Sequence, residues 1–481
     1  MKAFTKTLLA LATTALLSTT VMADTIDTSV GKLEFTHSFE AGYPTAATAE
    51  KLFKDMDRQR ATQAYLWAIP YVSFLAFEEG MQAQGMTDGQ LLYMPDRVAR
   101  SGGLTANHTT PYAVTTVDLT DSPMVIEIPD GVRGAAHSMW QIGLGQLTEA
   151  GKYLLMPKGG TIPADFDMTD VTVMESDTNR ALVIIRVMAP DMEEQKKTLA
   201  SIKFYSVTDH LNPTMKPLVI PTENWEGHSP HGEDFFRLLA KGLNNGGEIH
   251  ERDRLIVDGL RTFGIGRGLT YNPTKEQKAM LEDASIVGES MAKALDFAGT
   301  DRLELAHYSD GSQWEIATTS PSDQRFENSD ALDGRAAWFY EAITADTAMH
   351  AMTTGWGQAY LSTYTDTDGD YLNGKNAYVL HLDTPPPVDT FWSISIYDVE
   401  QRCLILNGTD KVGIDGRMNL TYNDDGSVDM YFSPVKPDGV NAANWVKTMD
   451  DKAWFPYFRF YSPKQEVQDR TWLLPDIQKA K

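Results

Sequence analysis

The sequence predicts a multi-domain, mainly β protein. We expect an N-terminal β-sandwich with a preceding helix, a helical insertion and a C-terminal jelly-roll-like β-sandwich. Short apolar segments separated by Gly, Pro and Asp occur in two blocks without alternating helices, which favours antiparallel sheets over a parallel one. Elsewhere, apolar residues recur every three or four positions, as in helices packed on a core. The 481 residues suffice for several domains, which we place at 45–220, 221–345 and 346–481.

Residues 1–23 have the features of a cleaved signal peptide. Two lysines precede an uncharged, leucine-rich segment from Thr7 to Val21, and Ala23 is a small residue at the cleavage position. A membrane anchor is the weaker alternative, because this segment is shorter than the roughly 20 residues that span a bilayer. No later stretch is long and apolar enough to do so. The sequence therefore predicts a soluble, exported protein, periplasmic or extracellular.

The first helix is expected at about 45–84. Leu66, Trp67 and Phe74 are among the large apolar residues that recur there at helical spacing. Pro70 lies inside this segment. Because proline lacks an amide hydrogen and crowds the preceding turn, it is expected to kink or divide the helix.

From Tyr112 to about Val207 the pattern changes to short strands. The clearest is Met124–Ile128, which lies between two prolines. Further strands are expected around Ser138–Leu144, Tyr153–Met156, Leu182–Met188 and Ile202–Val207.

Residues of about 229–300 return to helical spacing. Ser229 and Pro230 form a typical N-cap and first-turn pair. Thr274 precedes a long helix, and Gln277 completes a capping box with it. One apolar face of that helix is expected to carry Met280, Ala284, Val287, Met291 and Leu295, with Gly299 as terminator. A third helix is predicted over Ala331–Ile343.

The last hundred residues predict a second β region. Ala377–Leu382 is expected to form one strand, and three consecutive prolines follow it. In Phe391–Tyr397, apolar residues alternate, with Trp392, Ile394 and Ile396 on the predicted buried face. Similar alternation occurs around Met430 and around Phe458. This number of strands is typical of a sandwich or jelly roll.

Both halves of the chain carry recognisable motifs, which together extend over nearly the whole chain after residue 23. The N-terminal motifs are 64–70, 105–112, 118–119 and 151–155, the linking helices contribute 251–254 and 269–273, and the C-terminal motifs are 391–398, 423–428, 444–445, 458–461 and 472–477. These motifs resemble a bacterial two-domain family known only as domains of unknown function 1254 (N-terminal) and 1214 (C-terminal).

The resemblance implies a small β-sandwich, a helical insertion and a C-terminal jelly-roll-like sandwich. It implies no established activity, so it transfers no catalytic residue to this chain. Many relatives have an acidic residue where this chain has His108, which puts any role for an acid at that position in doubt.

Charge and cysteine content exclude several classes of protein. Forty-two basic residues against 66 acidic ones give a formal net charge of −24, which repels nucleic-acid phosphates and anionic lipids. The only cysteine, Cys403, rules out an intramolecular disulfide. It lies in the apolar run 403–406, where a buried, inert thiol is favoured over a reactive nucleophile.

One segment has the oxygen ligands that Ca²⁺ requires. Asp366, Asp368 and Asp370 alternate around Gly369. The glycine falls at the wrong position for an EF-hand, however, and Ala377 stands where that motif has a bidentate glutamate. The alternative is an aspartate-rich turn that leads into a strand, and we favour it. Calcium at this turn remains a hypothesis, and no other cofactor is expected.

Other motifs that could carry chemistry are incomplete. His228 and His231 flank Ser229 and Pro230, but His-Glu-x-x-His is absent, and Pro230 obstructs a nucleophile elbow. The glycine-rich segment 263–269 lacks the strand-to-helix unit of a dinucleotide site. These observations argue against a nucleotide cofactor.

Aromatic, basic and acidic residues on the predicted strands are the remaining candidates for a ligand site. Indole rings stack on flat or apolar ligand surfaces, and neighbouring polar groups orient the ligand. The alternative is that these residues are core packing or structural ion pairs. The candidates are Trp140, His137, Trp392, Asp398, Arg402, Trp445 and Arg459.

These observations favour a small-molecule or glycan ligand-binding or interaction protein. The alternative is a secreted or periplasmic enzyme of hydrolase or lyase type, with a pocket in or between the β domains, and the sequence leaves open whether the chain is an enzyme. A purely structural envelope role is disfavoured, because no repeat is visible. Sandwich edges and faces also make a homo-oligomer a reasonable expectation.

Overall fold

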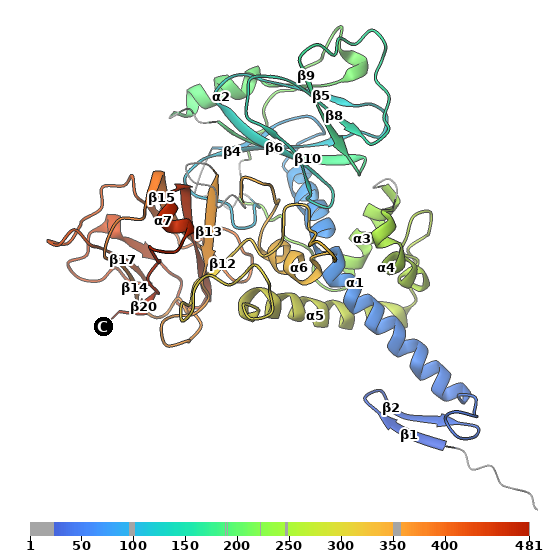
Figure 1. Ribbon diagram of the computed structural model, residues 1–481. Helices are drawn as coiled ribbons and strands as arrows, with labels where there is room; N and C mark the ends of the chain where they lie inside the picture. Colours follow the sequence, from blue (N-terminus) through green and yellow to red (C-terminus); the bar gives the residue numbers. More distant parts are fainter. Residues whose placement is uncertain are drawn as a thin grey trace, which may run out of the picture. The chain divides into compact units, whose positions relative to one another are not determined.

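The computed structural model describes most of the chain after the predicted signal peptide, which lies outside the described residues (Figure 1). The described residues are 24–95, 102–187, 189, 191–221, 223–245, 249–349 and 357–480. They form two compact units, one up to Gln59 and one from Arg60 onward. Among these residues, no helix has the length and apolar character needed to cross a membrane.

The first unit contains a β-hairpin and the beginning of the first helix. Strands β1 (Asp24–Thr28) and β2 (Gly31–Phe35) pair antiparallel. Helix α1 spans Ala46–Ala83, as the sequence predicted. Within this unit the amide of Glu34 donates to Thr48 Oγ1 at 2.8 Å, which ties the hairpin to the first turns of the helix.

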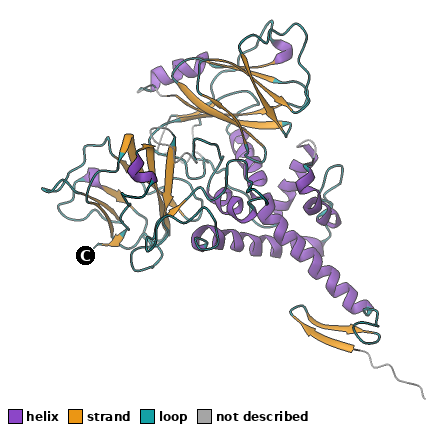
Figure 2. Ribbon diagram, viewed as in Figure 1, coloured by secondary structure: helices purple, strands orange, loops and turns teal. Residues whose placement is uncertain are grey.

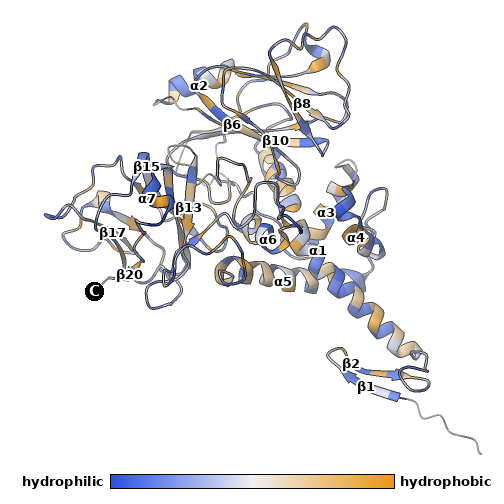
Figure 3. Cartoon of the chain, viewed as in Figure 1, coloured by the Kyte–Doolittle hydropathy of each residue, from blue (hydrophilic) through white to orange (hydrophobic). Residues whose placement is uncertain are grey.

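In the second unit the strands gather in two groups and most of the helices in a third (Figure 2). The prediction of a multi-domain, mainly β chain with a helical insertion is thereby confirmed. Hydrophobic and hydrophilic stretches alternate along the helices (Figure 3), as expected where one face packs on a core.

The first β domain is a sandwich of two sheets. A five-stranded sheet has the order β3 (Leu92–Met94), β4 (Tyr112–Asp118), β10 (Arg180–Val187), β6 (Val132–Ser138) and β7 (Gly143–Leu147). A four-stranded sheet has the order β11 (Lys203–Ser206), β5 (Met124–Ile128), β8 (Gly151–Pro157) and β9 (Val171–Ser176). All pairings are antiparallel except β8 with β9. Helix α2 (Met192–Ser201) precedes β11.

The five-stranded sheet has one face toward the sandwich core and one face away from it. Ala113, Ala136, Val183 and Ile185 point into the sandwich core together with Ile126 and Leu155 of the opposite sheet. Because successive side chains in a strand point to opposite faces, the residues between them point away from this core. That outward face carries the site described below.

The helical region packs around the part of α1 that belongs to the second unit. Its buried aromatic residues, such as Trp67 and Phe235, share one core with the second β domain. The other helices are α3 (Glu233–Asn245), α4 (Arg254–Gly259), α5 (Lys275–Ala298) and α6 (Leu332–Glu341). The predicted third helix over 331–343 is therefore present.

The structure confirms one detail of the predicted helices and differs from two others. Helix α1 is not divided at Pro70 but continues through it. The Thr274–Gln277 capping box is confirmed, with both reciprocal hydrogen bonds present. The predicted apolar face of α5 is only partly correct, because Met291 is exposed and the buried face instead includes Leu281, Gly288 and Ala292.

The N-cap prediction for Ser229 and Pro230 is wrong. Helix α3 begins at Glu233, and the carboxylate of Glu282, on α5, accepts a hydrogen bond from the Glu233 amide at 2.9 Å. A side chain from a neighbouring helix therefore caps α3, and Ser229 lies outside the helix.

The second β domain again contains five- and four-stranded sheets. The first has the order β12 (Glu315–Ile316), β13 (Gln358–Ser362), β19 (Trp454–Pro463), β15 (Val388–Asp398) and β16 (Gly413–Asp415). The second has the order β18 (Trp445–Lys447), β17 (Val428–Ser433), β14 (Tyr378–Leu382) and β20 (Gln478–Lys479). A short helix, α7 (Gln465–Gln468), follows β19.

Strand predictions agree with the structure except in one place, and Met188, the predicted end of one strand, lies outside the described residues. The predicted strand at 138–144 is wrong, because β6 ends at Ser138, β7 begins at Gly143, and a turn joins them. In that turn Gln141 has a φ of 61° and is fully buried. In the second β domain the residues from Phe391 to Asp398 are buried on both faces of the strand. The predicted alternation therefore identified only one of the two buried faces.

Candidate functional site

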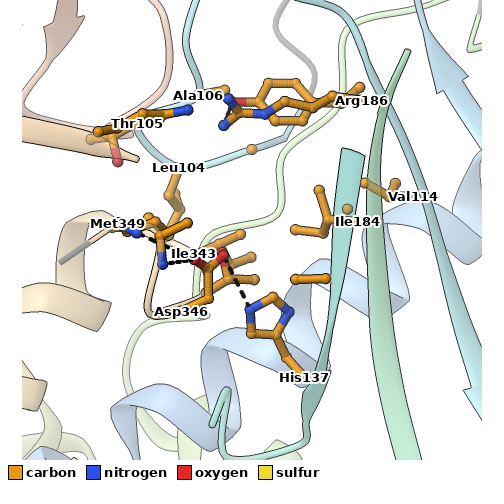
Figure 4. A pocket seen from close by; sticks show the side chains of 18 of the residues that line it. Leu104, Thr105, Ala106, Val114, His137, Ile184, Arg186, Ile343, Asp346 and Met349 are labelled. Carbon is orange, nitrogen blue, oxygen red and sulfur yellow. Dashed lines mark hydrogen bonds and ion pairs between the residues drawn. The ribbon is translucent and has the colours of Figure 1, made fainter. Parts of the chain in front are cut away.

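A cavity of about 180 Å³ lies on the outward face of the five-stranded sheet of the first β domain (Figure 4). Its other walls come from the loop that precedes β4, from the segment that follows α6, and from strands β13 and β19 of the second β domain. Both β domains and the helical region therefore contribute to its walls.

Strand register explains which side chains form the floor. Ile184 on β10 lies opposite Val114 on β4 and Ala135 on β6, and these three residues form an apolar centre. Two positions along β10 from Ile184, Arg186 lies at one end of this floor. At the other end, His137 pairs in register with Leu182. A polar group thus borders the apolar floor on each side.

The guanidinium of Arg186 stands over the ring of Tyr112, 5.1 Å from its centroid, and donates to the Tyr112 hydroxyl at 3.3 Å. Tyr112 also accepts a hydrogen bond from the Asn107 side chain. Within the part of the chain that the structure describes, no carboxylate forms an ion pair with Arg186.

A second guanidinium, that of Arg459 on β19, reaches the same cavity. It is only 4% exposed, and it donates to Tyr397 Oη at 2.7 Å, to the Thr105 carbonyl at 2.5 Å and to Ser395 Oγ at 3.3 Å. These partners are all neutral. Arg459 too has no carboxylate partner among the described residues, although three hydrogen bonds fix its position.

At the far end of the floor, His137 faces Asp346 (Figure 4). The Nε2 atom of His137 lies 3.9 Å from Asp346 Oδ2, and neither ring nitrogen has a hydrogen-bond partner among the residues that the structure describes. The backbone amides of Ala348 and Met349 donate to Asp346 Oδ1 at 2.8 and 3.2 Å. These amides fix the carboxylate so that its second oxygen points to the imidazole.

Burial controls the charge of this imidazole. It lowers the pKa of His137 to about 4, although the nearby Asp346 carboxylate acts in the opposite direction. His137 is therefore neutral at pH 7. A neutral imidazole beside a fixed carboxylate can accept, donate or relay a proton.

Behind the cavity wall lies a group of buried acids. The hydroxyl of Tyr457, which lines the cavity, donates to Glu341 on α6. The Glu341 and Asp296 side chains are close enough to hydrogen-bond each other, and burial raises the pKa of both. Two carboxyl groups in such contact favour sharing one proton.

The structure brings two of the seven predicted ligand residues, His137 and Arg459, to one cavity. Trp140 instead packs between helices, 4.6 Å from the ring of Tyr71. Trp392 stacks on Phe458 in the core of the second β domain. Trp445 donates to the Ser433 carbonyl at 3.2 Å. Asp398 is buried at the end of β15, where it accepts from the Gln401 amide at 2.8 Å.

Arg402, the remaining candidate, lines a smaller cavity beside α5 and α6. It has a φ of 58° and stands over the ring of Tyr340 at 4.2 Å. His231, in the same cavity, forms an ion pair of 2.8 Å with Glu289, and this hydrogen bond raises the pKa of His231. Cys403, next in sequence, is buried, as the sequence favoured.

The three candidate calcium ligands, Asp366, Asp368 and Asp370, do converge. Lys479 on β20 lies among them, with Nζ at 3.4, 3.1 and 2.5 Å from their carboxylates. The main chain of the turn also donates to Asp366, with the Asp368 amide at 2.9 Å. A calcium ion at this turn would have to displace the ammonium group of Lys479.

Sequence reasoning did not single out Arg186 or Asp346 as ligand residues. Arg186 interrupts an otherwise apolar strand, and its parity with Ile184 places it on the outward face. This combination could have identified it. Asp346 lies in an irregular segment after α6, where no periodicity applies, so its approach to His137 could not be read from the sequence.

Comparisons with known proteins identify both β domains. Residues 89–207 match the family described as Protein of unknown function (DUF1254), and residues 357–465 match Protein of unknown function (DUF1214). No curated protein matches this chain.

Two solved structures resemble it. The VPA0106 protein from Vibrio parahaemolyticus has a TM-score of 0.54 at 16% identity, over 88% of this chain and 100% of that one. A putative uncharacterized protein from Burkholderia cenocepacia has a TM-score of 0.41 at 12% identity, over 91% and 97%. The first likeness supports the fold. The chain therefore carries a DUF1254 domain followed by a DUF1214 domain, which is the two-domain arrangement that the sequence motifs predicted.

Proposed function

We propose that this protein binds a small amphipathic carboxylic acid in the cavity between its two β domains. The observation that carries the proposal is the pair of arginines, Arg186 and Arg459, which line the cavity and have no carboxylate within ion-pair distance among the described residues. Taking a charge out of water is costly unless an opposite charge compensates it. A bound carboxylate would supply that charge, and guanidinium groups suit the planar geometry of a carboxylate.

The cavity walls define the rest of the ligand. Val114, Ile184 and Ala135 form the floor, and Leu104 and Ile343 are among the apolar residues opposite them. A volume of about 180 Å³ is slightly larger than the roughly 150 Å³ that holds benzene. An aryl or branched alkyl group attached to a carboxylate therefore fits this space better than an extended glycan.

Calorimetry with a charged and an uncharged ligand tests the proposal. We expect 3-phenylpropanoate to bind the wild-type protein at least tenfold more tightly than 3-phenylpropanamide, because only the acid neutralises the arginines. The variant Arg186→Met should lose at least tenfold in affinity for the acid. Arg237→Met, which removes an exposed arginine paired with Asp234, is the matched control and should bind as the wild type does.

Equal affinity for acid and amide would contradict the proposal. So would an Arg186→Met variant that binds the acid as tightly as the control does. Thermal melting of each variant separates lost binding from lost folding.

The second candidate is an enzyme that acts on the same ligand. The pairing of neutral His137 with Asp346 in the cavity favours it, because this pair could transfer a proton at a bound substrate. Incubation of the protein with a panel of bound acids, followed by mass spectrometry, tests this idea. Product formation that disappears in His137→Phe would support an enzyme. Acids that remain unchanged in every incubation would support binding without catalysis.

We also propose export of the protein, on the pattern of residues 1–23. Cell fractionation and N-terminal sequencing should recover a chain that starts at Asp24 outside the cytoplasm. A cytoplasmic chain that retains residue 1 would contradict export.

A further inference from the structure

We propose that the bound acid carries a hydroxyl group at the end remote from its carboxylate, and that His137 and Asp346 recognise this hydroxyl. The inference rests on the proposed function, since it assumes that the carboxylate lies at Arg186 and Arg459. It assigns a second recognition site and a narrower ligand class, the hydroxy-substituted aryl or alkyl acids.

The gap between the two side chains suits one oxygen atom. His137 Nε2 and Asp346 Oδ2 are 3.9 Å apart, which is too far for a direct hydrogen bond. An oxygen at about 2.8 Å from both would complete a triangle with an angle close to 90° at that oxygen. A hydroxyl can donate to the carboxylate and interact with the imidazole at the same time.

His137 is a buried side chain whose polar ring atoms are unsatisfied by the described residues. The side chain is 1% exposed, and within the described part of the chain neither ring nitrogen has a hydrogen-bond partner. Buried polar atoms in folded proteins are nearly always satisfied, so an orphaned imidazole that lines a cavity points to a ligand or water. Asp346 Oδ1 already accepts hydrogen bonds from two backbone amides. A ligand hydroxyl would therefore donate to the other oxygen, Oδ2.

Chemistry favours a hydroxyl over other groups. A hydroxyl has one hydrogen, so when it donates to Asp346 it can only accept from the imidazole, which must then be the neutral tautomer that carries its proton on Nε2. An ether oxygen cannot donate to Asp346, and an ammonium group cannot accept from Nε2. Only a group that donates to Asp346 and accepts from the Nε2 hydrogen satisfies both side chains.

Spacing along the sheet separates the two recognition sites. Leu182, the register partner of His137, is four residues from Arg186 on β10, which corresponds to about 13 Å of strand. Ile184 and Ala135 lie between the two ends. Because Arg186 and His137 both line the cavity, an aryl acid with a terminal hydroxyl can contact both.

The test compares three ligands on one scaffold by calorimetry. These are 3-phenylpropanoate, its 4-hydroxy derivative and its 4-methoxy derivative, which keeps an acceptor oxygen but has no donor. We expect the hydroxy acid to bind the wild-type protein at least tenfold more tightly than either of the others. In Asp346→Asn and in His137→Phe, the affinity ratio of hydroxy acid to parent acid should fall below threefold.

Asp310→Asn is the matched control, because Asp310 is exposed and lies outside this cavity. Its ratio should equal that of the wild type. The wild-type comparison of the hydroxy and methoxy acids needs no variant, so the inference stays testable even if a substitution prevents folding.

The outcomes separate the two proposals. If the parent acid binds but the hydroxyl adds nothing, or adds as much in Asp346→Asn as in the control, the inference about the hydroxyl fails and the acid site remains. If none of the three acids binds, the proposed function fails and the inference fails with it.

Discussion

Three carboxyl groups, those of Asp296, Glu315 and Glu341, lie in the interior, and among the described residues none of them forms an ion pair. Burial raises the pKa of Glu315 to about 8, and the Thr300 hydroxyl, which donates to it, only partly offsets this effect. Unfolding exposes the group to water and returns its pKa to 4.5. Between these two values the native state holds a proton that the unfolded state releases.

Stability should therefore fall as pH rises from about 4.5 to about 8. One such group lowers the free energy of unfolding by about 1.4 kcal/mol for each pH unit across this range. Its stabilising effect is fully present below pH 4.5. In Glu315→Gln the carboxyl is replaced by a neutral amide of similar shape. We expect the free energy of unfolding of this variant to decline less steeply over the same range.

Urea unfolding at pH 5, 6, 7 and 8 measures this difference. Glu193→Gln, which changes an exposed glutamate, is the control and should follow the wild type. Parallel curves for Glu315→Gln and the wild type would show that Glu315 does not hold a proton in the native state.

At the same scale, the candidate site was only partly predictable. His137 and Arg459 lie on strands, where alternation identifies a side chain that points away from a core. Asp346 owes its orientation to the amides of Ala348 and Met349, in a segment without periodicity. Its distance to His137 depends on how α6 packs against the first β domain, and local sequence does not encode that packing.

Secondary-structure elements show where local rules suffice and where they fail. The Thr274–Gln277 capping box lies within four residues, so the sequence alone predicts it correctly. The cap of α3 comes from Glu282, 49 residues further along the chain, and Ser229 only resembles a cap. The turn at 139–142 was missed for a similar reason. Its Gln141 side chain binds the Pro70 carbonyl and the Thr344 amide, each at 2.7 Å.

The α3 cap can be tested by a pair of substitutions. Glu282→Gln weakens the interaction of a carboxylate with the positive end of the helix, and it should lower the free energy of unfolding by about 1 kcal/mol. Ser229→Ala should change it by less than about 0.5 kcal/mol, as an ordinary surface substitution does. Chemical denaturation of both variants gives the comparison. A larger loss in Ser229→Ala would restore Ser229 as the cap.

For the molecule as a whole, the domain order and the mainly β character followed from composition, periodicity and the family resemblance. The packing of the two β domains against each other did not follow from the sequence, because the contacts between them are long-range. The Thr109 hydroxyl lies 3.0 Å from that of Tyr461, and Arg459 binds the Thr105 carbonyl. These residues belong to two of the segments that carried the family resemblance, and both segments border the cavity or its immediate surroundings.

The C-terminal strand provides a further test at this scale. Lys479, on β20, holds the position among Asp366, Asp368 and Asp370 that a calcium ion would take. Calcium should therefore raise the melting temperature of Lys479→Met more than that of the wild type, since the variant leaves three carboxylates uncompensated. Chelator-treated samples are the reference. Equal shifts in the two proteins, or none in the variant, would remove calcium from consideration at this turn.

A crystal structure of the wild-type protein grown with 3-phenylpropanoate would test the central claim most directly. We predict that the carboxylate lies within about 3 Å of an Arg186 guanidinium nitrogen, with the ring over Ile184 and Ala135 and the far end toward His137. A ligand bound elsewhere, or a carboxylate turned away from Arg186 and Arg459, would contradict the account.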